Sequence, residues 1–111
     1  MNEDVKKRWV KALRSGEYDQ GTGGLKEDGF CCLGVLCDLH RKETGGEWNM
    51  LGLIGVYLGE QNFLPNAVME WAGLTVIDPV VKHNDYMDNL STINDSGADF
   101  NTIADLIEAQ L

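Results

Sequence analysis

The sequence predicts a small α+β domain with about four helices, one of them central and buried, and a short antiparallel sheet of two to four strands. Its 111 residues are 43% hydrophobic and 24% charged, which is typical of a globular chain with one core. Several segments repeat apolar residues at helical spacing, and turn residues bound the short extended stretches between them. No internal repeat or linker divides the chain, so we expect one domain over residues 1–111.

The first segment, residues 2–14, is expected to form an amphipathic helix with Asn2 as its N-cap and Gly16 as its stop. Five of the nine Lys and Arg residues of the chain lie in this segment. Most of them fall opposite Trp9 on a helical wheel, as on an ordinary solvated face, although the same face would also attract an anion. The apolar residues recur every three or four positions: Val5, Trp9, Ala12 and Leu13.

A glycine-rich connection over residues 17–29, with Leu25 as a short strand, leads to the predicted central helix at residues 30–42. Apolar residues cover an arc of about 200° of this helix, counting about 100° per residue. So wide an arc indicates burial on most sides. Gly34 lies at its edge, where a second backbone would be able to come close. Gly45 and the glycine after it are expected to end the helix.

The chain after the central helix is expected to contain shorter elements. Residues 48–63 fit neither period and are interpreted as a loop with a short strand. Pro65 should begin a short helix that ends at Gly73. Residues 74–81 alternate in polarity, but Pro79 restricts them to an edge strand or an extended segment.

The last quarter of the chain is expected to begin with a surface loop at residues 82–88. A short strand at 90–93 and a turn at 94–97 follow. Asp99 is the predicted N-cap of a final helix. One face of that helix is apolar, so the C-terminal segment should be docked on the core; its residues are Phe100, Ile103, Ala104, Ile107 and Leu111.

The cysteines and the apolar runs indicate a cytoplasmic protein. The chain has three cysteines, and Cys31 and Cys32 are adjacent, which does not suit a disulfide framework. We therefore expect reduced, buried thiols. No apolar run approaches the roughly 18 residues needed to span a bilayer, and residues 1–7 do not resemble a signal peptide, so no membrane association is expected.

Charge is distributed unevenly along the chain, whose formal net charge is −9. Residues 1–58 carry nine acidic and eight basic residues, a net of −1, whereas residues 59–111 carry nine acidic residues against Lys82 alone, a net of −8. Because acidic surfaces repel phosphate backbones, direct nucleic-acid binding is not expected. A local anion site in the first half remains compatible with these charges.

Metal and thiol chemistry have only weak support in the sequence. Cys37 and His40 would be able to ligate zinc with Cys31 or Cys32, but there is no paired C-x-x-C, and no metal or cofactor is expected. Cys31 precedes the central helix, where a helix N-terminus lowers thiol pKa, with His83 or His40 as a base. A thiol-dependent enzyme is thus a lesser alternative, and no catalytic residue is assigned.

The more economical hypothesis is a ligand site for a small anionic nucleotide in the first half. Basic side chains would bind phosphate, aromatic rings would stack on a base, an amide would hydrogen-bond its edge, and glycines would let a phosphate approach. Cys31 lies at the entrance of the central helix beside this segment. The predicted ligand-binding residues are Lys11, Arg14, Tyr18, Gln20, Gly21, Gly23, Cys31 and Trp48.

Distinctive motifs run through nearly the whole chain. They are Trp9-Val-Lys-Ala-Leu-Arg-Ser-Gly-Glu-Tyr18, Gln20-Gly21, Leu25, Cys31-Cys32-Leu-Gly-Val-Leu-Cys37-Asp38-Leu39, Leu64-Pro65, Trp71-Ala-Gly73-Leu74, Leu90, Asn94-Asp95, Gly97, Phe100 and Ile103-Ala-Asp-Leu-Ile-Glu108. In these motifs the chain resembles a family of small proteins of tailed bacteriophages and prophages. The resemblance implies a phage context, and no settled activity comes with it.

Small phage proteins without catalytic motifs often act by binding, so two functions follow as expectations. The first is a non-enzymatic counter-defence protein that sequesters a small nucleotide signal in the host cytoplasm, as a homo-oligomer. The second is an acidic inhibitor that uses residues 60–108 as a nucleic-acid-like surface against a basic host protein.

Overall fold

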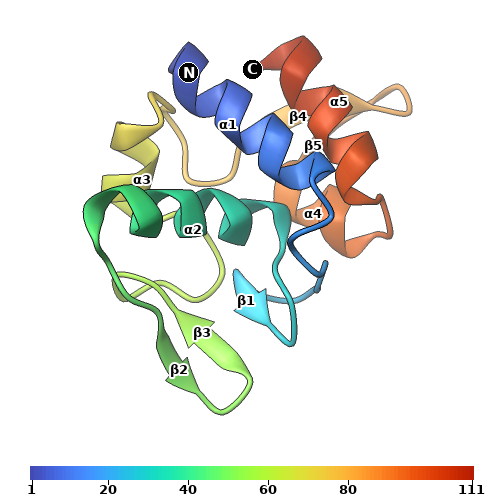
Figure 1. Cartoon of the computed structure of the whole chain (residues 1–111). Helices are drawn as coiled ribbons and strands as arrows, with labels where there is room; N and C mark the ends of the chain where they lie inside the picture. The colour runs from blue at the N-terminus through green and yellow to red at the C-terminus, as the bar shows by residue number, and fades with distance from the viewer.

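The computed structural model describes residues 1–111 and contains five helices and two small antiparallel sheets, which confirms the predicted α+β class (Figure 1). The helix α2 runs between α1 on one side and the three-stranded sheet on the other, with α3 and α4 near its two ends. The elements in chain order are α1 (Glu3–Arg14), β1 (Lys26–Glu27), α2 (Cys32–Thr44), β2 (Asn49–Leu51), β3 (Ile54–Val56), α3 (Asn66–Trp71), β4 (Val80–His83), β5 (Tyr86–Asn89), α4 (Leu90–Asp95) and α5 (Phe100–Gln110).

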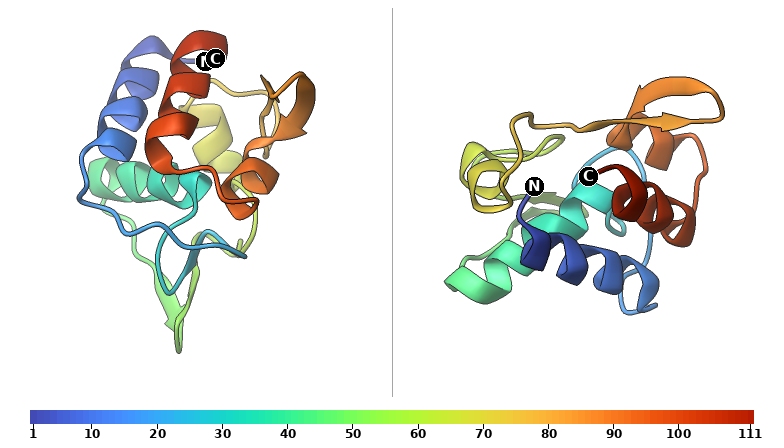
Figure 2. Two further views of the ribbon diagram at one scale, coloured as in Figure 1. Left: turned by 90° about the vertical axis from the view of Figure 1, so that its right-hand side faces the viewer. Right: turned by 90° about the horizontal axis from the view of Figure 1, so that it is seen from above.

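The first and last helices lie side by side, so both ends of the chain are close together (Figure 2). Each begins at the residue that the sequence predicts as its cap. The Asn2 side chain accepts a hydrogen bond from the Val5 N–H at 3.0 Å, and the Asp99 side chain accepts one from Thr102 at 2.8 Å. These bonds satisfy N–H groups that a helix start otherwise leaves without partners.

The central helix α2 is buried, as expected, along most of its first two turns. Trp9 of α1 is completely buried and donates its indole N–H to the Cys32 carbonyl at 2.9 Å. A Cβ atom added at Gly34 would lie 1.7 Å from the carbonyl oxygen of Leu25, so the backbone before β1 crosses α2 in direct contact. The expectation of a close backbone approach at Gly34 is therefore confirmed.

The three-stranded sheet has the order β1-β3-β2, and β3 pairs with both neighbours through Gly55, opposite Lys26 and Met50. The second sheet is the hairpin β4–β5, which contradicts the predicted surface loop at residues 82–88. Asn84 and Asp85 form its turn with φ of 52° and 68°. Asn and Asp tolerate positive φ, so this polar pair allows a two-residue hairpin turn.

The predicted strand at residues 90–93 is wrong, because these residues begin the short helix α4. Leu90 and Ile93 are both buried, at the i, i+3 spacing of a helix face. The N–H and hydroxyl of Ser91 both bond the carboxylate of Asp78, which fixes the first turn. Of the predicted turn at 94–97, Asn94 and Asp95 belong to this helix, while Ser96 and Gly97 form the turn that follows it, with a φ of 108° at Gly97.

One cluster of 22 buried residues, drawn from all five helices, from β4 and from the loops between these elements, forms the core. All three cysteines are buried free thiols within it. No helix has both the length and the apolar composition needed to cross a membrane.

Candidate functional site

The structure separates the predicted ligand-binding residues into three groups. Lys11 and Arg14 lie on the outer face of α1. Tyr18 and Trp48 meet at Asp38 of α2. The remaining four, Gln20, Gly21, Gly23 and Cys31, lie along the loop that contacts α4.

The basic face of α1 borders a groove of about 680 Å³ that also includes Glu108 of α5. Arg14 is engaged within the chain: its guanidinium binds Asp105 at 2.6 Å and Glu108 at 3.1 Å, and the hydrogen bonds that it donates to these carboxylates raise its pKa. Lys11 forms no ion pair, and Lys6 and Lys7 line the groove beside it. This face attracts anions, but no aromatic ring borders it, so it offers nothing for a base to stack on.

Tyr18 and Trp48, by contrast, are held together by one carboxylate. The Asp38 side chain is 7% exposed; its Oδ2 accepts from the Tyr18 hydroxyl at 2.6 Å, and its Oδ1 accepts from Trp48 Nε1 at 3.1 Å and from Arg41 Nε at 2.6 Å. Burial would raise the pKa of Asp38, but the hydrogen bonds from Arg41, Tyr18 and Trp48 outweigh it and hold that pKa below its ordinary value. Asp38 is therefore an anion that fixes both rings.

Cations lie over the same rings. Lys26 Nζ is 4.9 Å from the centroid of Phe30 and 5.4 Å from that of Trp48, and Lys42 Nζ is 5.3 Å from that of Tyr18. Phe30 joins the two predicted rings in edge-to-face contacts, with its ring centroid 5.0 Å from that of Tyr18 and 6.0 Å from that of Trp48. We call this group the aromatic–cation site; it consists of Tyr18, Lys26, Phe30, Asp38, Arg41, Lys42 and Trp48.

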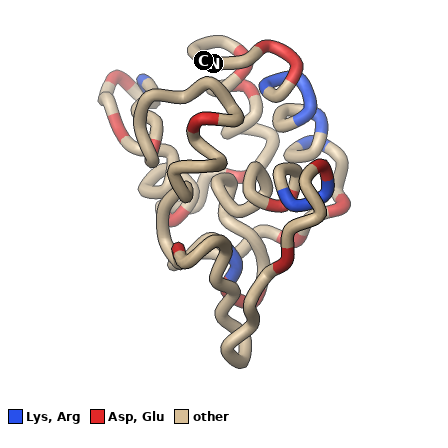
Figure 3. Tube along the Cα trace, turned by 90° about the vertical axis from the view of Figure 1, so that its left-hand side faces the viewer, with Lys and Arg blue, Asp and Glu red and all other residues tan.

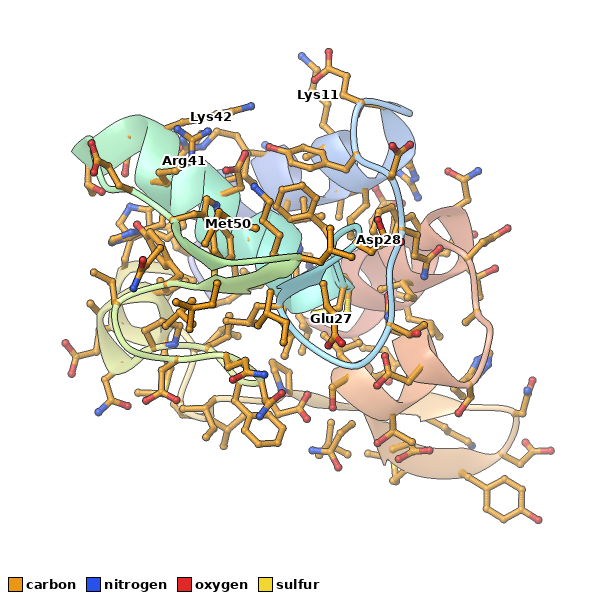
Figure 4. The ribbon with its side chains drawn as sticks, turned by 90° about the horizontal axis from the view of Figure 1, so that it is seen from below. Lys11, Glu27, Asp28, Arg41, Lys42 and Met50 are labelled. Atoms are coloured by element: carbon orange, nitrogen blue, oxygen red, sulfur yellow. The ribbon has the colours of Figure 1, made fainter.

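A hollow of about 310 Å³ adjoins the aromatic–cation site, between Trp48, Arg41 and Lys26. Figure 4 shows Arg41 and Lys42 next to each other on α2, with Lys11 of α1 toward the same edge of this view. Figure 3 shows the same concentration of Lys and Arg, along α1 and at the end of α2. The surface beside the rings thus carries three of the nine Lys and Arg residues of an acidic protein: Lys26, Arg41 and Lys42.

Gln20 and Gly21 are used in contacts within the chain. Gln20 Nε2 donates to Asn94 Oδ1 at 2.9 Å and to the Ala98 carbonyl at 2.8 Å. Asn94 is 1% exposed, and it also donates to the Gly21 carbonyl at 2.9 Å and accepts from the Cys32 N–H at 3.3 Å. This network joins the loop, α2 and α4, so these groups hold the fold and are not directed at a ligand.

Gly23 and Cys31 line a small hollow of about 180 Å³ beside α4. Cys31 is 2% exposed, and burial raises the pKa of its thiol to about 11, so the thiolate that nucleophilic catalysis needs is scarce at neutral pH. His40 bonds the Tyr57 hydroxyl at 2.6 Å, and His83 lies in the hairpin β4–β5. No group of three or more His, Cys, Asp or Glu side chains is arranged to hold a metal ion.

Sequence reasoning missed Lys26, Phe30, Asp38, Arg41 and Lys42 as parts of the site. One signal was present: Asp38 is followed by Arg41 and Lys42 at i+3 and i+4, the spacing at which side chains on a helix meet. The short strand that the sequence predicts at Leu25 begins one residue later, as β1. There Lys26 lies directly opposite Gly55 of β3.

Neither a curated protein nor a solved structure matches the chain. A family model described as "Domain of unknown function (DUF8296)" matches residues 1–111, and the chain therefore belongs to that family.

Proposed function

We propose that the protein is a non-enzymatic binding protein that sequesters a small anionic nucleotide at the aromatic–cation site, and that it acts in this way as a bacteriophage accessory protein against a nucleotide signal of host defence. The observation that carries the proposal is the convergence of three half-buried rings, Tyr18, Phe30 and Trp48, with Lys26 and Lys42 above them. The resemblance to phage proteins supports the biological context.

The chemistry of the site suits both parts of a nucleotide. Aromatic faces stack on any base, and such stacking contributes about 1–3 kcal/mol per base in single-strand binding proteins. Arg41 binds Asp38 through Nε, so its terminal nitrogens remain available to a phosphate. Three cations, Lys26, Arg41 and Lys42, face two carboxylates, Asp38 and Glu47, which leaves a local net charge of +1.

The dimensions of the hollow agree with this use. At about 310 Å³ it lies at the small end of the range of about 300–1,000 Å³ for ligand pockets. Its wall contains an indole ring, and its polar groups come from α2, β1 and the loop after α2 that contains Glu47. The contact between Gly34 and Leu25 holds α2 against the residue before β1. A preformed site of this kind loses little conformational freedom when a ligand binds.

Titration calorimetry with a panel of cyclic nucleotides and ADP-ribose derivatives tests the proposal. We expect heat from at least one of them, with affinity about 5- to 10-fold weaker in Lys26→Gln and in Lys42→Gln, because each change removes a cation worth about 1 kcal/mol over a ring or phosphate. The matched control is Lys82→Gln, an exposed lysine on β4 outside the site, which should bind like the parent protein. Absence of heat with the whole panel, or an equal loss in the control, would contradict the proposal.

A further inference from the structure

Two adjacent hollows lie beside α4, outside the aromatic–cation site. The first is the hollow of about 180 Å³ near Gly23 and Cys31, and the second has a volume of about 340 Å³. They share Phe63 and Ser91 as a common wall. We call them the acidic hollows; the first is lined by Gly23, Gly24, Cys31, Asn62, Phe63, Ser91 and Asp95, and the second by Phe63, Ile77, Asp78, Asn89, Ser91 and Thr92.

The charge around the acidic hollows is negative and uncompensated. Asp95 lines the first and Asp78 the second, while no Lys, Arg or His lines either of them. Glu27 stands at the rim, because its Oε2 would be 3.1 Å and 3.3 Å from Cβ atoms added at Gly23 and Gly24. None of the three carboxylates forms an ion pair; Asp78 accepts from Ser91, and Asp95 accepts from the Gly23 N–H and the Asn94 amide, all neutral donors.

The negative potential extends to the floor of the first hollow. Burial is the main cause that raises the pKa of the Cys31 thiol, and the charges of Asp95 and Asp78 raise it further. Both carboxylates therefore act on the interior of the hollow from opposite sides of the shared wall. An anionic ligand would be repelled there, and a cationic one attracted.

Apolar surface accompanies this charge. Phe63, which lines both hollows, is 42% exposed, and Ile77, which lines the second, is 41% exposed. A ring face beside carboxylates suits a guanidinium or ammonium group, which it attracts through its quadrupole. The apolar walls also suit the aliphatic stem of an Arg or Lys side chain.

We propose that the acidic hollows are the docking site for an extended basic peptide segment of a partner protein, with one Arg or Lys side chain in each hollow on either side of Phe63. In an extended segment, alternate side chains point to the same face about 7 Å apart, so two cations of one short segment reach two neighbouring hollows. This site is distinct from the nucleotide site and takes the opposite charge. Figure 4 shows Glu27 on the other side of β1 from Lys11, Arg41 and Lys42.

The test measures fluorescence anisotropy of a fluorescein-labelled (Gly-Arg)3 amide with the full chain. The same peptide with citrulline in place of arginine gives the uncharged comparison. We expect saturable binding of the arginine peptide and at least about tenfold weaker binding of the citrulline peptide, because citrulline keeps the shape but loses the charge. The double variant Asp78→Asn, Asp95→Asn should lower the affinity for the arginine peptide about tenfold, because it removes both negative charges. Asparagine preserves the size of the side chain and one hydrogen-bond acceptor, so the fold should be retained.

The matched control is Glu70→Gln with Asp85→Asn, which also removes two negative charges but from exposed positions on α3 and the β4–β5 turn. It should bind the arginine peptide within about twofold of the parent protein. An equal loss in this control would overturn the proposal, because binding would then follow the net charge alone. Absence of saturable binding, or equal binding of the citrulline peptide, would overturn it as well.

A further variant, Phe63→Leu, keeps all carboxylates. It tests the shared wall of the two hollows even if the double asparagine variant does not fold. It should weaken the arginine peptide about threefold, and unchanged affinity in this folded variant would overturn the placement beside Phe63. Lys26→Gln, which tests the nucleotide proposal, should leave peptide binding unchanged, so each proposal can fail without the other. If Lys26→Gln abolished peptide binding, the proposal that the two sites are separate would be overturned.

Discussion

The start of α2 and the two hairpins differ in how they use their side chains. Around Cys32 and Gly34, buried groups hold the loop before β1, α2 and α4 in direct contact. At the hairpin ends, by contrast, large apolar side chains face solvent: Leu53 is 68% exposed near the β2–β3 turn, and Met87 is 67% exposed on β5. We therefore expect the free energy of unfolding to depend on the interlocked region and only weakly on the exposed side chains of the hairpins.

The two regions also differ in what glycine does. Gly34 is required because a neighbouring carbonyl occupies the place of a side chain. Gly52, in the β2–β3 turn, is required only by its φ of 66°, since nothing lies within 4 Å of an added Cβ. One glycine thus serves a contact between elements, and the other serves a local turn.

The largest expected effect is that of Gly34→Ala. An added methyl would lie 1.7 Å from the Leu25 oxygen, so α2 and the loop would have to separate, at a cost of about 4 kcal/mol or more. Gly52→Ala is the matched control and should cost about 1 kcal/mol, from the positive φ alone. Urea unfolding followed by tryptophan fluorescence measures both. Similar midpoints for the two variants would remove the distinction between the regions.

A smaller loss is expected for Asn94→Ala. The change leaves the Gln20 amide, the Gly21 carbonyl and the Cys32 N–H without their buried partner, and an unsatisfied buried group costs about 1–3 kcal/mol. Asn94→Asp keeps the acceptor for Gln20 and Cys32 but loses the donor to Gly21 and Asp95, and it places a buried carboxylate beside that of Asp95, so at pH 7 it should be at least as destabilised as the alanine variant. Urea unfolding again measures the free energies of the variants. Surface changes usually alter the free energy of unfolding by less than about 0.5 kcal/mol. An alanine variant within about that range of the parent protein would contradict the role of Asn94.

The elements that the sequence predicts correctly are those with a complete local signal. The helix α1 has a cap at Asn2 and a regular apolar face, and α5 has the same combination with Asp99. The helix α4 lacks both: Asn89 makes no side-chain capping bond, and the anchor of Ser91 is the distant residue Asp78. A six-residue element fixed by a tertiary contact cannot be recognised from its own periodicity.

The candidate site shows the same limit. The chemistry of Tyr18 and Trp48 predicts their place in a site, but Asp38, which brings them together, lies 20 and 10 residues from them in the sequence. Arg14 has the chemistry of an anion-binding residue as well, but it pairs with Asp105 and Glu108, far along the chain. Residue types therefore predict what a site contains, whereas long-range partners decide which of these groups remain available.

The smallest change in the free energy of unfolding is expected for exposed side chains of the hairpins. Leu53→Ser and Met87→Ser replace side chains that are already mostly in water, so each should change the free energy of unfolding by less than about 0.5 kcal/mol. Leu36→Ser, on the buried face of α2, is the matched control, and it should cost about 3 kcal/mol because it leaves both a cavity and a buried hydroxyl. A loss of about 2 kcal/mol in either hairpin variant would be as large as that expected for Asn94→Ala. It would mean that these side chains are covered in solution, for example by a second copy of the chain in a homo-oligomer. In that case the midpoint should rise with protein concentration, because association stabilises the folded state by mass action.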